Sequence, residues 1–294
     1  MGLRSPRGKV TTDPEVTVNV PASDVLKVPG ASLYHEVSGE GPVLVFIAGG
    51  STDAGVFGAV AALLADAYTV VAYDPRGNSR SPLDGPAEDQ RIEIHAEDAR
   101  RLIEKVAVGP VYVFGSSSGA IAGLELVTRH PELVHRLIAH EPPAIRLLAD
   151  ASAEEAFFAE IQEVYRRDGA DAAMERFAVG AGMPDVAPPP GVELPAPVVE
   201  MLDRIGRNSG FFLEHEMLQF TGFGGLDVPA LKALAARIVL ACGADSREHL
   251  PARPVRALAA DFGTGLVEFP GGHLGYLTHP VEFATRLREV LAAG

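Results

Sequence analysis

The feature that most constrains the fold is a series of short apolar runs separated by longer amphipathic segments. These strand-like runs cover residues 43–48, 68–73, 111–115, 137–140, 238–242 and 266–269. Most positions in these runs are apolar rather than alternating with polar residues, which is typical of strands that are covered on both faces. We therefore predict an α/β protein with a mostly parallel, doubly wound sheet of about eight strands and helices on both faces.

The remaining strands are expected near the beginning of the chain. Residues 25–28 and 33–37 are joined around Pro29 and Gly30, which favours an antiparallel hairpin. In the parallel part of the sheet, right-handed crossovers bring the carboxyl ends of the strands to one edge. Residues that follow such ends are therefore expected to converge, although they lie far apart in the chain.

A serine between two glycines follows one of these runs. Residues 111–123 read VYVFGSSSGAIAG, with Ser117 between Gly115 and Gly119 and a helical pattern over 120–130. This is Gly-x-Ser-x-Gly between a strand and a helix, the setting in which the motif marks a nucleophile. A Gly- and Ser-rich connecting loop is the alternative, but the flanking strand and helix favour a sharp turn that exposes Ser117.

A serine hydroxyl needs a base and a carboxylate that orients the base. His273 follows the strand-like run 266–269 after Pro-Gly-Gly, and Asp245 follows the run 238–242. We therefore predict Ser117, Asp245 and His273 as the catalytic residues, in the chain order nucleophile, acid, histidine. Glu141 follows another run, 137–140, and remains the alternative acid.

These features together resemble the α/β-hydrolase superfamily over about residues 25–293. Residues 43–50 resemble the strand and oxyanion loop of that family, with Ala48 where a histidine is common, and residues 74–81 resemble its Asp-x-Arg-Gly-x-Gly-x-Ser loop, with Ser79 in place of the second glycine. The resemblance implies an oxyanion hole formed by the backbone N–H groups of Gly50 and Ser118. It also implies that the 74–81 loop is structural, with Asp74 and Arg76 as an ion pair.

Strand-like runs and helical segments stop alternating between the two halves of the predicted core, residues 22–145 and 228–294. Residues 146–227 contain helical patterns at 153–167, 170–178, 197–206 and 211–220 and a Pro-rich stretch at 183–197, which is expected to be irregular. The resemblance implies a helical lid here. The candidate substrate-binding residues are apolar and favour a small hydrophobic substrate: Phe157, Phe158, Phe212, Met217 and Phe220. Residues 1–21 are expected to be a disordered lead-in.

Charge and composition narrow the classes of partner. The net charge of −14 disfavours nucleic acid, and no apolar stretch is long enough to span a membrane. A single cysteine, Cys242, and an N-terminus without the apolar segment of a secretory signal favour a cytoplasmic protein. His215 and Glu216 begin like a zinc-protease motif, but Gln219 stands where the second histidine is required, so we predict no metal and no cofactor.

The sequence thus predicts a serine hydrolase that cleaves an ester, lactone, thioester or amide through an acyl-enzyme, with a carboxylic ester as the first choice. Three other enzymes remain alternatives: a cofactor-free haloperoxidase-like enzyme, a C–C bond hydrolase and a prolyl aminopeptidase. In the aminopeptidase, Glu214 and Glu216 would bind the amine of the substrate. Both glutamates are expected on a solvated helix face. A non-hydrolytic relative that binds or cyclises a ligand is the third class. The substrate and the oligomeric state are not predicted.

Overall fold

A computed structural model describes residues 21–183 and 193–293. Its centre is an eight-stranded sheet in the order β1-β2-β4-β3-β5-β6-β7-β8. The strands are β1 (Ala22–Val28), β2 (Ala31–Ser38), β3 (Val43–Ile47), β4 (Thr69–Tyr73), β5 (Val111–Ser116), β6 (Val134–His140), β7 (Ile238–Gly243) and β8 (Val267–Phe269). Each predicted run corresponds to one of them.

The sheet is parallel except at one edge. The hairpin β1–β2 is antiparallel, as predicted, and β2 also pairs antiparallel with β4, whereas β3 to β8 pair in parallel. In the parallel part, Ile47 lies beside Gly115, and Ser116 lies beside His140. The carboxyl ends of β3, β5 and β6 therefore meet at one edge, where Ser117 follows β5.

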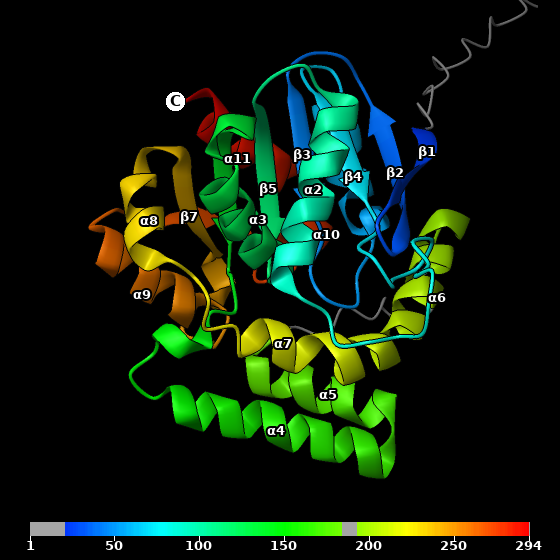
Figure 1. Ribbon diagram of the computed structural model, residues 1–294, viewed down its shortest axis with the longest axis vertical. Coiled ribbons are helices and arrows are strands. Elements are labelled where there is room, and N and C mark those ends of the chain that lie inside the picture. The colour runs from blue at the N-terminus through cyan, green and yellow to red at the C-terminus, as the bar shows by residue number, and fades with distance from the viewer. Residues whose placement is uncertain (1–20, 184–192, 294) are drawn as a thin grey trace, which may run out of the picture.

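Helices cover both faces of this sheet, as predicted for a doubly wound fold (Figure 1). One face packs against α2 (Ile92–Val106), α3 (Ser118–Arg129), α8 (Val228–Ala233) and α9 (Ala252–Phe262). The other packs against α1 (Gly58–Leu64), α10 (Gly275–Thr278) and α11 (Pro280–Ala292). Short 3-10 turns complete the core: η1 (Ala54–Phe57), η2 (Pro131–Leu133), η3 (Ile145–Leu147), η5 (Ala235–Arg237) and η6 (Ala244–Ser246). Buried apolar side chains fill both layers, because the strands are apolar on both sides.

Between β6 and α8 the chain forms a group that we call the inserted helices: α4 (Ala151–Asp168), α5 (Ala170–Ala181), α6 (Ala196–Phe211) and α7 (Met217–Thr221). Figure 1 shows α4, α5 and α7 together beyond one end of the strands. They share a small apolar core that includes Phe158, Ile161 and Leu213. The predicted break after residue 206 is wrong: α6 continues through a π-helical segment, η4 (Phe212–Glu216), directly into α7.

Two expectations concern residues outside this description. The predicted lead-in 1–21 lies outside the described residues except for Pro21, and so does most of the Pro-rich stretch, residues 184–192. The proposed boundaries 22–145, 146–227 and 228–294 stay a prediction.

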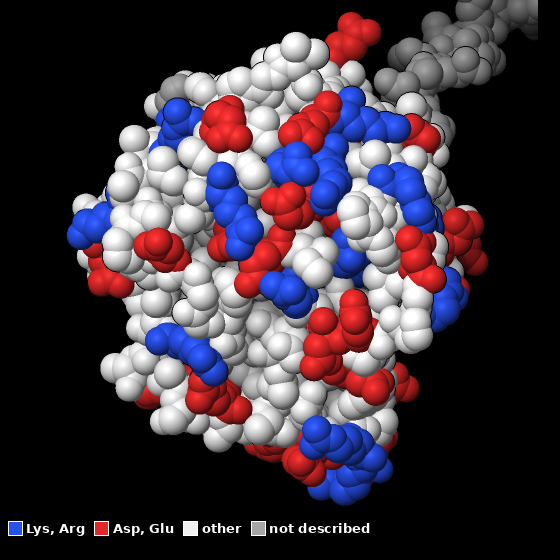
Figure 2. All heavy atoms as spheres, viewed as in Figure 1, with Lys and Arg blue, Asp and Glu red and all other residues white. Residues whose placement is uncertain are grey.

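The described surface and helices add two observations. Basic and acidic side chains are interspersed over the face drawn in Figure 2. In residues 21–183 and 193–293, every helix is too short or too polar to cross a bilayer.

Candidate active site

Ser117 occupies a strained turn between β5 and α3. Its φ of 56° and ψ of −127° lie in a region that residues other than glycine rarely adopt. The backbone N–H of Ser117 donates to the carbonyl of His140, and the Ser117 carbonyl accepts from Ala120, so both sides of the turn are fixed. This geometry is that of a nucleophile elbow, which lifts a serine hydroxyl above the end of its strand.

Close backbone contacts explain the two glycines around Ser117. A Cβ at Gly115 would lie 2.4 Å from the carbonyl oxygen of Gly119, and a Cβ at Gly119 would lie 2.2 Å from that of Ile47. Real side chains do not tolerate such distances, so α3 can pack this tightly against β5 and β3 only with glycine at both positions.

His273 reaches the same edge from the loop after β8. Its Nδ1 lies 2.5 Å from Oε2 of Glu141, and the other carboxylate oxygen of Glu141 accepts the backbone N–H of Gly243 at 2.8 Å. Glu141 directly follows β6, has a positive φ of 51° and is 1% exposed. Its carboxylate is therefore held on both oxygens, and it orients the imidazole from a buried position.

Asp245 is not the residue that meets His273, so that prediction is corrected. After β7 the chain turns into η6, where the side chain of Asp245 is exposed. Among the described residues, Asp245 forms one hydrogen bond, from its backbone N–H to the Gly271 carbonyl. The backbone after each strand explains the choice, because Glu141 has a positive φ of 51° and is buried, whereas Asp245 is exposed in the turn η6. Strand order does not explain it, since β7 lies beside β8, the strand that precedes His273.

Local interactions keep Glu141 ionised. Burial alone would raise the pKa of Glu141, but the imidazoles of His140 and His273 and the backbone N–H of Gly243 lower it below its ordinary value. His140 itself is fully buried, and burial lowers its pKa to about 4. At neutral pH, Glu141 is therefore a carboxylate, and it accepts a hydrogen bond from Nδ1–H of His273.

Ser117, His273 and Glu141 line one cavity of about 540 Å³. Among the described residues, Ser117 Oγ and His273 form no hydrogen bond, although their side chains share this cavity. In enzymes generally, the hydrogen bond between a nucleophile and its base is often long before substrate binds and shortens afterwards.

The walls of this cavity are mostly apolar. Four predicted substrate-binding residues contribute to them: Phe158, Phe212, Met217 and Phe220. Phe157 does not, because its ring packs against Phe158 and under the guanidinium of Arg176, so that prediction is corrected. Other lining residues come from outside the inserted helices and were not predicted: Pro143, Ile145, Leu250, Pro251 and Pro254. Nothing in their local sequence distinguishes them.

Of the two predicted oxyanion donors, Ser118 lines this cavity, whereas Gly50 is not among its lining residues. Neither the Ser118 nor the Gly50 backbone N–H donates to another backbone group of the described chain. Gly50 lies directly under the ring of Phe212, because a Cβ at Gly50 would be 2.3 Å from Phe212 Cε2. The lack of a side chain at residue 50 therefore lets the inserted helices approach the oxyanion loop.

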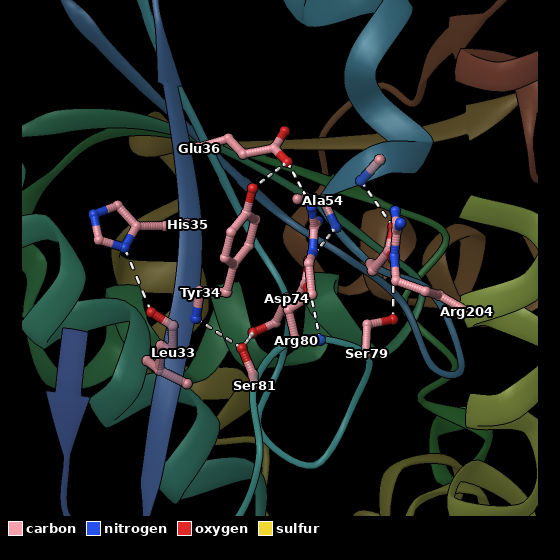
Figure 3. Close-up of polar contacts among 12 residues, drawn as sticks. Leu33, Tyr34, His35, Glu36, Ala54, Asp74, Ser79, Arg80, Ser81 and Arg204 are labelled. Atoms are coloured by element: carbon pink, nitrogen blue, oxygen red, sulfur yellow. Dashed lines mark hydrogen bonds and ion pairs between the residues drawn. The ribbon is translucent and has the colours of Figure 1, made fainter. Parts of the chain in front are cut away.

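The loop 74–81 is structural, but its ion pairs differ from the prediction. Asp74 pairs with Arg80 rather than Arg76, and Arg80 also contacts Glu36 and lies over the ring of Tyr34 (Figure 3). Arg76 instead forms a bidentate pair with Asp98 of α2, with both distances at 2.7 Å. These buried pairs fix the loop against the strands and against α2.

The same loop connects the core to α6. Asp53 is fully buried and accepts from Arg204 Nε at 2.6 Å and from Ser79 Oγ at 2.9 Å. Asn208 accepts the backbone N–H of Ser79 and donates to the carbonyl of Ser51. Figure 3 shows Ser79 and Arg204 converging from the two sides of this contact. The serine that replaces the second glycine of the loop thus ties α6 to the oxyanion loop.

The expectation that Glu214 and Glu216 share a solvated face is half wrong. Glu214 is exposed, but Glu216 is 2% exposed and accepts a hydrogen bond from Asn78 Nδ2 at 2.8 Å. Burial raises the pKa of Glu216 to about 7. Within residues 21–183 and 193–293, no cluster of three His, Cys, Asp or Glu side chains is arranged to hold a metal.

Comparison with known proteins agrees with this architecture. A family model described as "Alpha/beta hydrolase family" matches residues 44–286. The chain is 38% identical over 282 residues to "Uncharacterized hydrolase YraK" of Bacillus subtilis (strain 168), which covers 94% of this chain and 97% of that protein.

Solved structures resemble the fold at low sequence identity. The epoxide hydrolase VrEH1 from Vigna radiata has a TM-score of 0.69 at 15% identity, over 95% of this chain and 99% of that one. A mutant of the N-acyl homoserine lactonase AidH, complexed with N-hexanoyl homoserine, has a TM-score of 0.68 at 20% identity, over 93% and 97%. With its parallel sheet, its serine elbow and a family match over most of its length, this chain belongs to the alpha/beta hydrolase family.

Proposed function

We propose that the protein is a serine hydrolase that cleaves a carboxylic ester or lactone through an acyl-enzyme. The observation that carries the proposal is that Ser117, on its strained elbow, lines the same cavity as a His273 side chain held by a buried glutamate. A serine beside an imidazole that a carboxylate orients is the arrangement that catalyses acyl transfer in serine hydrolases.

In the proposed reaction, Ser117 Oγ attacks the acyl carbon while His273 Nε2 takes its proton. Glu141 accepts a hydrogen bond from His273 Nδ1–H and stabilises the imidazolium without taking its proton. The carbonyl oxygen becomes an oxyanion beside the backbone N–H groups of Gly50 and Ser118. His273 then protonates the leaving alcohol, and a water activated by the same imidazole cleaves the acyl-enzyme.

The cavity supports an uncharged, hydrophobic acyl group. Aromatic and aliphatic side chains form most of the wall around Ser117, and the charged Glu141 is engaged with His273. We propose that the inserted helices act as a lid, since they contribute Phe158, Phe177, Phe212, Met217 and Phe220 to this wall.

A serine at the elbow separates this proposal from epoxide hydrolysis. An epoxide hydrolase mechanism would require a carboxylate at residue 117. The likeness to VrEH1 at 15% identity extends to the fold alone. The substrate panel includes lactones because AidH is described as a lactonase. At 20% identity, its similarity to this chain is evidence for a shared fold only.

The test combines active-site labelling with a substrate panel. A fluorophosphonate probe should label the wild-type protein and fail to label Ser117→Ala. The panel consists of p-nitrophenyl esters of increasing acyl length together with N-acyl homoserine lactones. We expect hydrolysis of uncharged esters or lactones that Ser117→Ala abolishes. If the wild-type protein is folded but is neither labelled nor active on any member, the proposed function is wrong.

A further inference from the structure

A second, narrower cavity is lined by residues of the oxyanion loop. Residues 47–50 form one wall, and the start of α3 forms another. Ser118 and Phe220 line both cavities, so the two cavities share part of their walls next to Ser117 in the chain. The proposed oxyanion donors, the N–H groups of Gly50 and Ser118, belong to residues that border this second space.

Glu216 brings an unusual polar group to this cavity. Its Oε1 accepts from Asn78, whereas its Oε2 is buried and has no hydrogen-bond partner among the described residues. Glu216 is the last residue of the π-helical segment η4. Such π-helical segments are rare in proteins, and those that occur often lie at functional sites. Burying a carboxyl oxygen without a hydrogen-bond partner destabilises the fold, so such an oxygen in a native protein suggests that a ligand supplies the missing hydrogen bond.

The surroundings favour the protonated form of this carboxyl group. Burial raises the pKa of Glu216 to about 7, and the hydrogen bond from Asn78 and the nearby backbone N–H of Ser51 only partly oppose this. The other titratable residue that lines the cavity is His95 of α2, whose pKa burial lowers to about 3, so it is neutral. The lining residues from the oxyanion loop, from α3 and from the 74–81 loop carry no charge.

We propose that Glu216 is a third hydrogen-bond donor of the oxyanion hole. Its Oε2–H donates to the carbonyl oxygen of the substrate, beside the N–H groups of Gly50 and Ser118. This inference rests on the proposed function. As Ser117 adds to the acyl carbon, the electron pair of the carbonyl π-bond moves onto the oxygen, and Glu216 stabilises that charge while it keeps its own proton. An ionised Glu216 would repel the oxyanion instead.

Two substitutions separate this role from a structural one. In Glu216→Gln, the amide oxygen still accepts from Asn78, so the amide nitrogen replaces Oε2 and donates without titrating. In Glu216→Met, the volume is similar but the donor is lost. Glu214→Gln and Glu214→Met are the matched controls, because Glu214 is exposed on the same π-helical segment. Circular dichroism and thermal unfolding check that each variant is folded.

The measurements are kcat, KM and the pH dependence of kcat/KM for the best p-nitrophenyl ester. We expect Glu216→Met to lower kcat roughly a hundredfold with little change in KM. The wild-type kcat/KM should fall above about pH 7 as Glu216 ionises, and this fall should be absent in Glu216→Gln. The Glu216→Gln variant should retain most of the neutral-pH activity, and both Glu214 variants should behave like the wild type.

The inference is overturned if Glu216→Met keeps the wild-type kcat. It is equally overturned if Glu216→Gln loses as much activity as Glu216→Met, or if it retains the fall at alkaline pH. The isosteric Glu216→Gln decides the question by its pH profile if Glu216→Met does not fold. Ser117→Ala separates the two proposals: activity that survives in Ser117→Ala refutes the serine mechanism, whereas an inactive Ser117→Ala with a fully active Glu216→Met refutes only the third donor.

Discussion

The pairing of His273 with Glu141 predicts a sharp difference between two acidic residues. In Glu141→Gln, the side-chain oxygen must still accept the N–H of Gly243, which lies 2.8 Å from Oε1. The amide NH₂ then faces Nδ1 of His273 in place of Oε2. It would donate to Nδ1 and force the proton of the imidazole onto Nε2, the atom that must accept the proton of Ser117.

The expected loss is large because both orientation and charge are removed. An acid-to-amide change that imposes the wrong tautomer in a serine protease triad lowers kcat about 10⁴-fold. At about 1.4 kcal/mol for each factor of ten, this corresponds to about 5.5 kcal/mol of transition-state stabilisation. We expect Glu141→Gln to lose about 10³- to 10⁴-fold in kcat and to remain folded, since the hydrogen bond to Gly243 is kept.

Asp245→Asn is the matched control, since Asp245 is exposed and follows the neighbouring strand β7. Initial rates of p-nitrophenyl ester hydrolysis measure both variants, with thermal unfolding as the check on folding. Asp245→Asn should stay within about twofold of the wild type, because the exposed Asp245 side chain does not contact His273 and its backbone N–H is kept. The reasoning is refuted if Asp245→Asn loses more activity than Glu141→Gln.

Three further predictions concern stability. Gly50→Ala should lower the free energy of unfolding by about 1–3 kcal/mol and reduce activity, because its Cβ would lie 2.3 Å from an aromatic carbon of the inserted helices. Arg204→Met should cost about 3 kcal/mol in urea unfolding, because it leaves the fully buried carboxylate of Asp53 without its cation. His95→Phe should flatten the loss of stability on acidification below pH 6.5, because His95, with a pKa of about 3, stays neutral in the fold while the unfolded chain binds a proton.

Control variants and contrary outcomes test these three predictions. Gly58→Ala, with nothing within 4 Å of its Cβ, should be neutral or stabilising, and an equal loss at both glycines would contradict the packing argument. Arg166→Met breaks an exposed pair with Glu163 and should cost less than about 1 kcal/mol. For His95, the wild type should lose up to about 1.4 kcal/mol per pH unit more than the variant between pH 6.5 and pH 4, and parallel curves would show that His95 titrates freely.

Much of the fold and part of the candidate site follow from local sequence. The mostly apolar runs predicted the parallel strands, since a strand that is covered on both faces needs apolar residues on both sides. The spacing of Gly115, Ser117 and Gly119 predicted the elbow, because only glycine permits the close contacts on either side of the serine. The position of His273 after the last strand likewise followed from the rule that parallel strands end at one edge.

The tertiary structure alone decided which carboxylate meets the histidine. Asp245 and Glu141 both follow apolar strands, and their local sequences offer no means of choosing between them. Tertiary contacts separate them, because Glu141 is buried between the backbone N–H of Gly243 and the imidazole of His273, whereas Asp245 is exposed. The burial of Glu216 also depends on tertiary contacts, because its carboxylate accepts a hydrogen bond from Asn78, which lies 138 residues away in the chain.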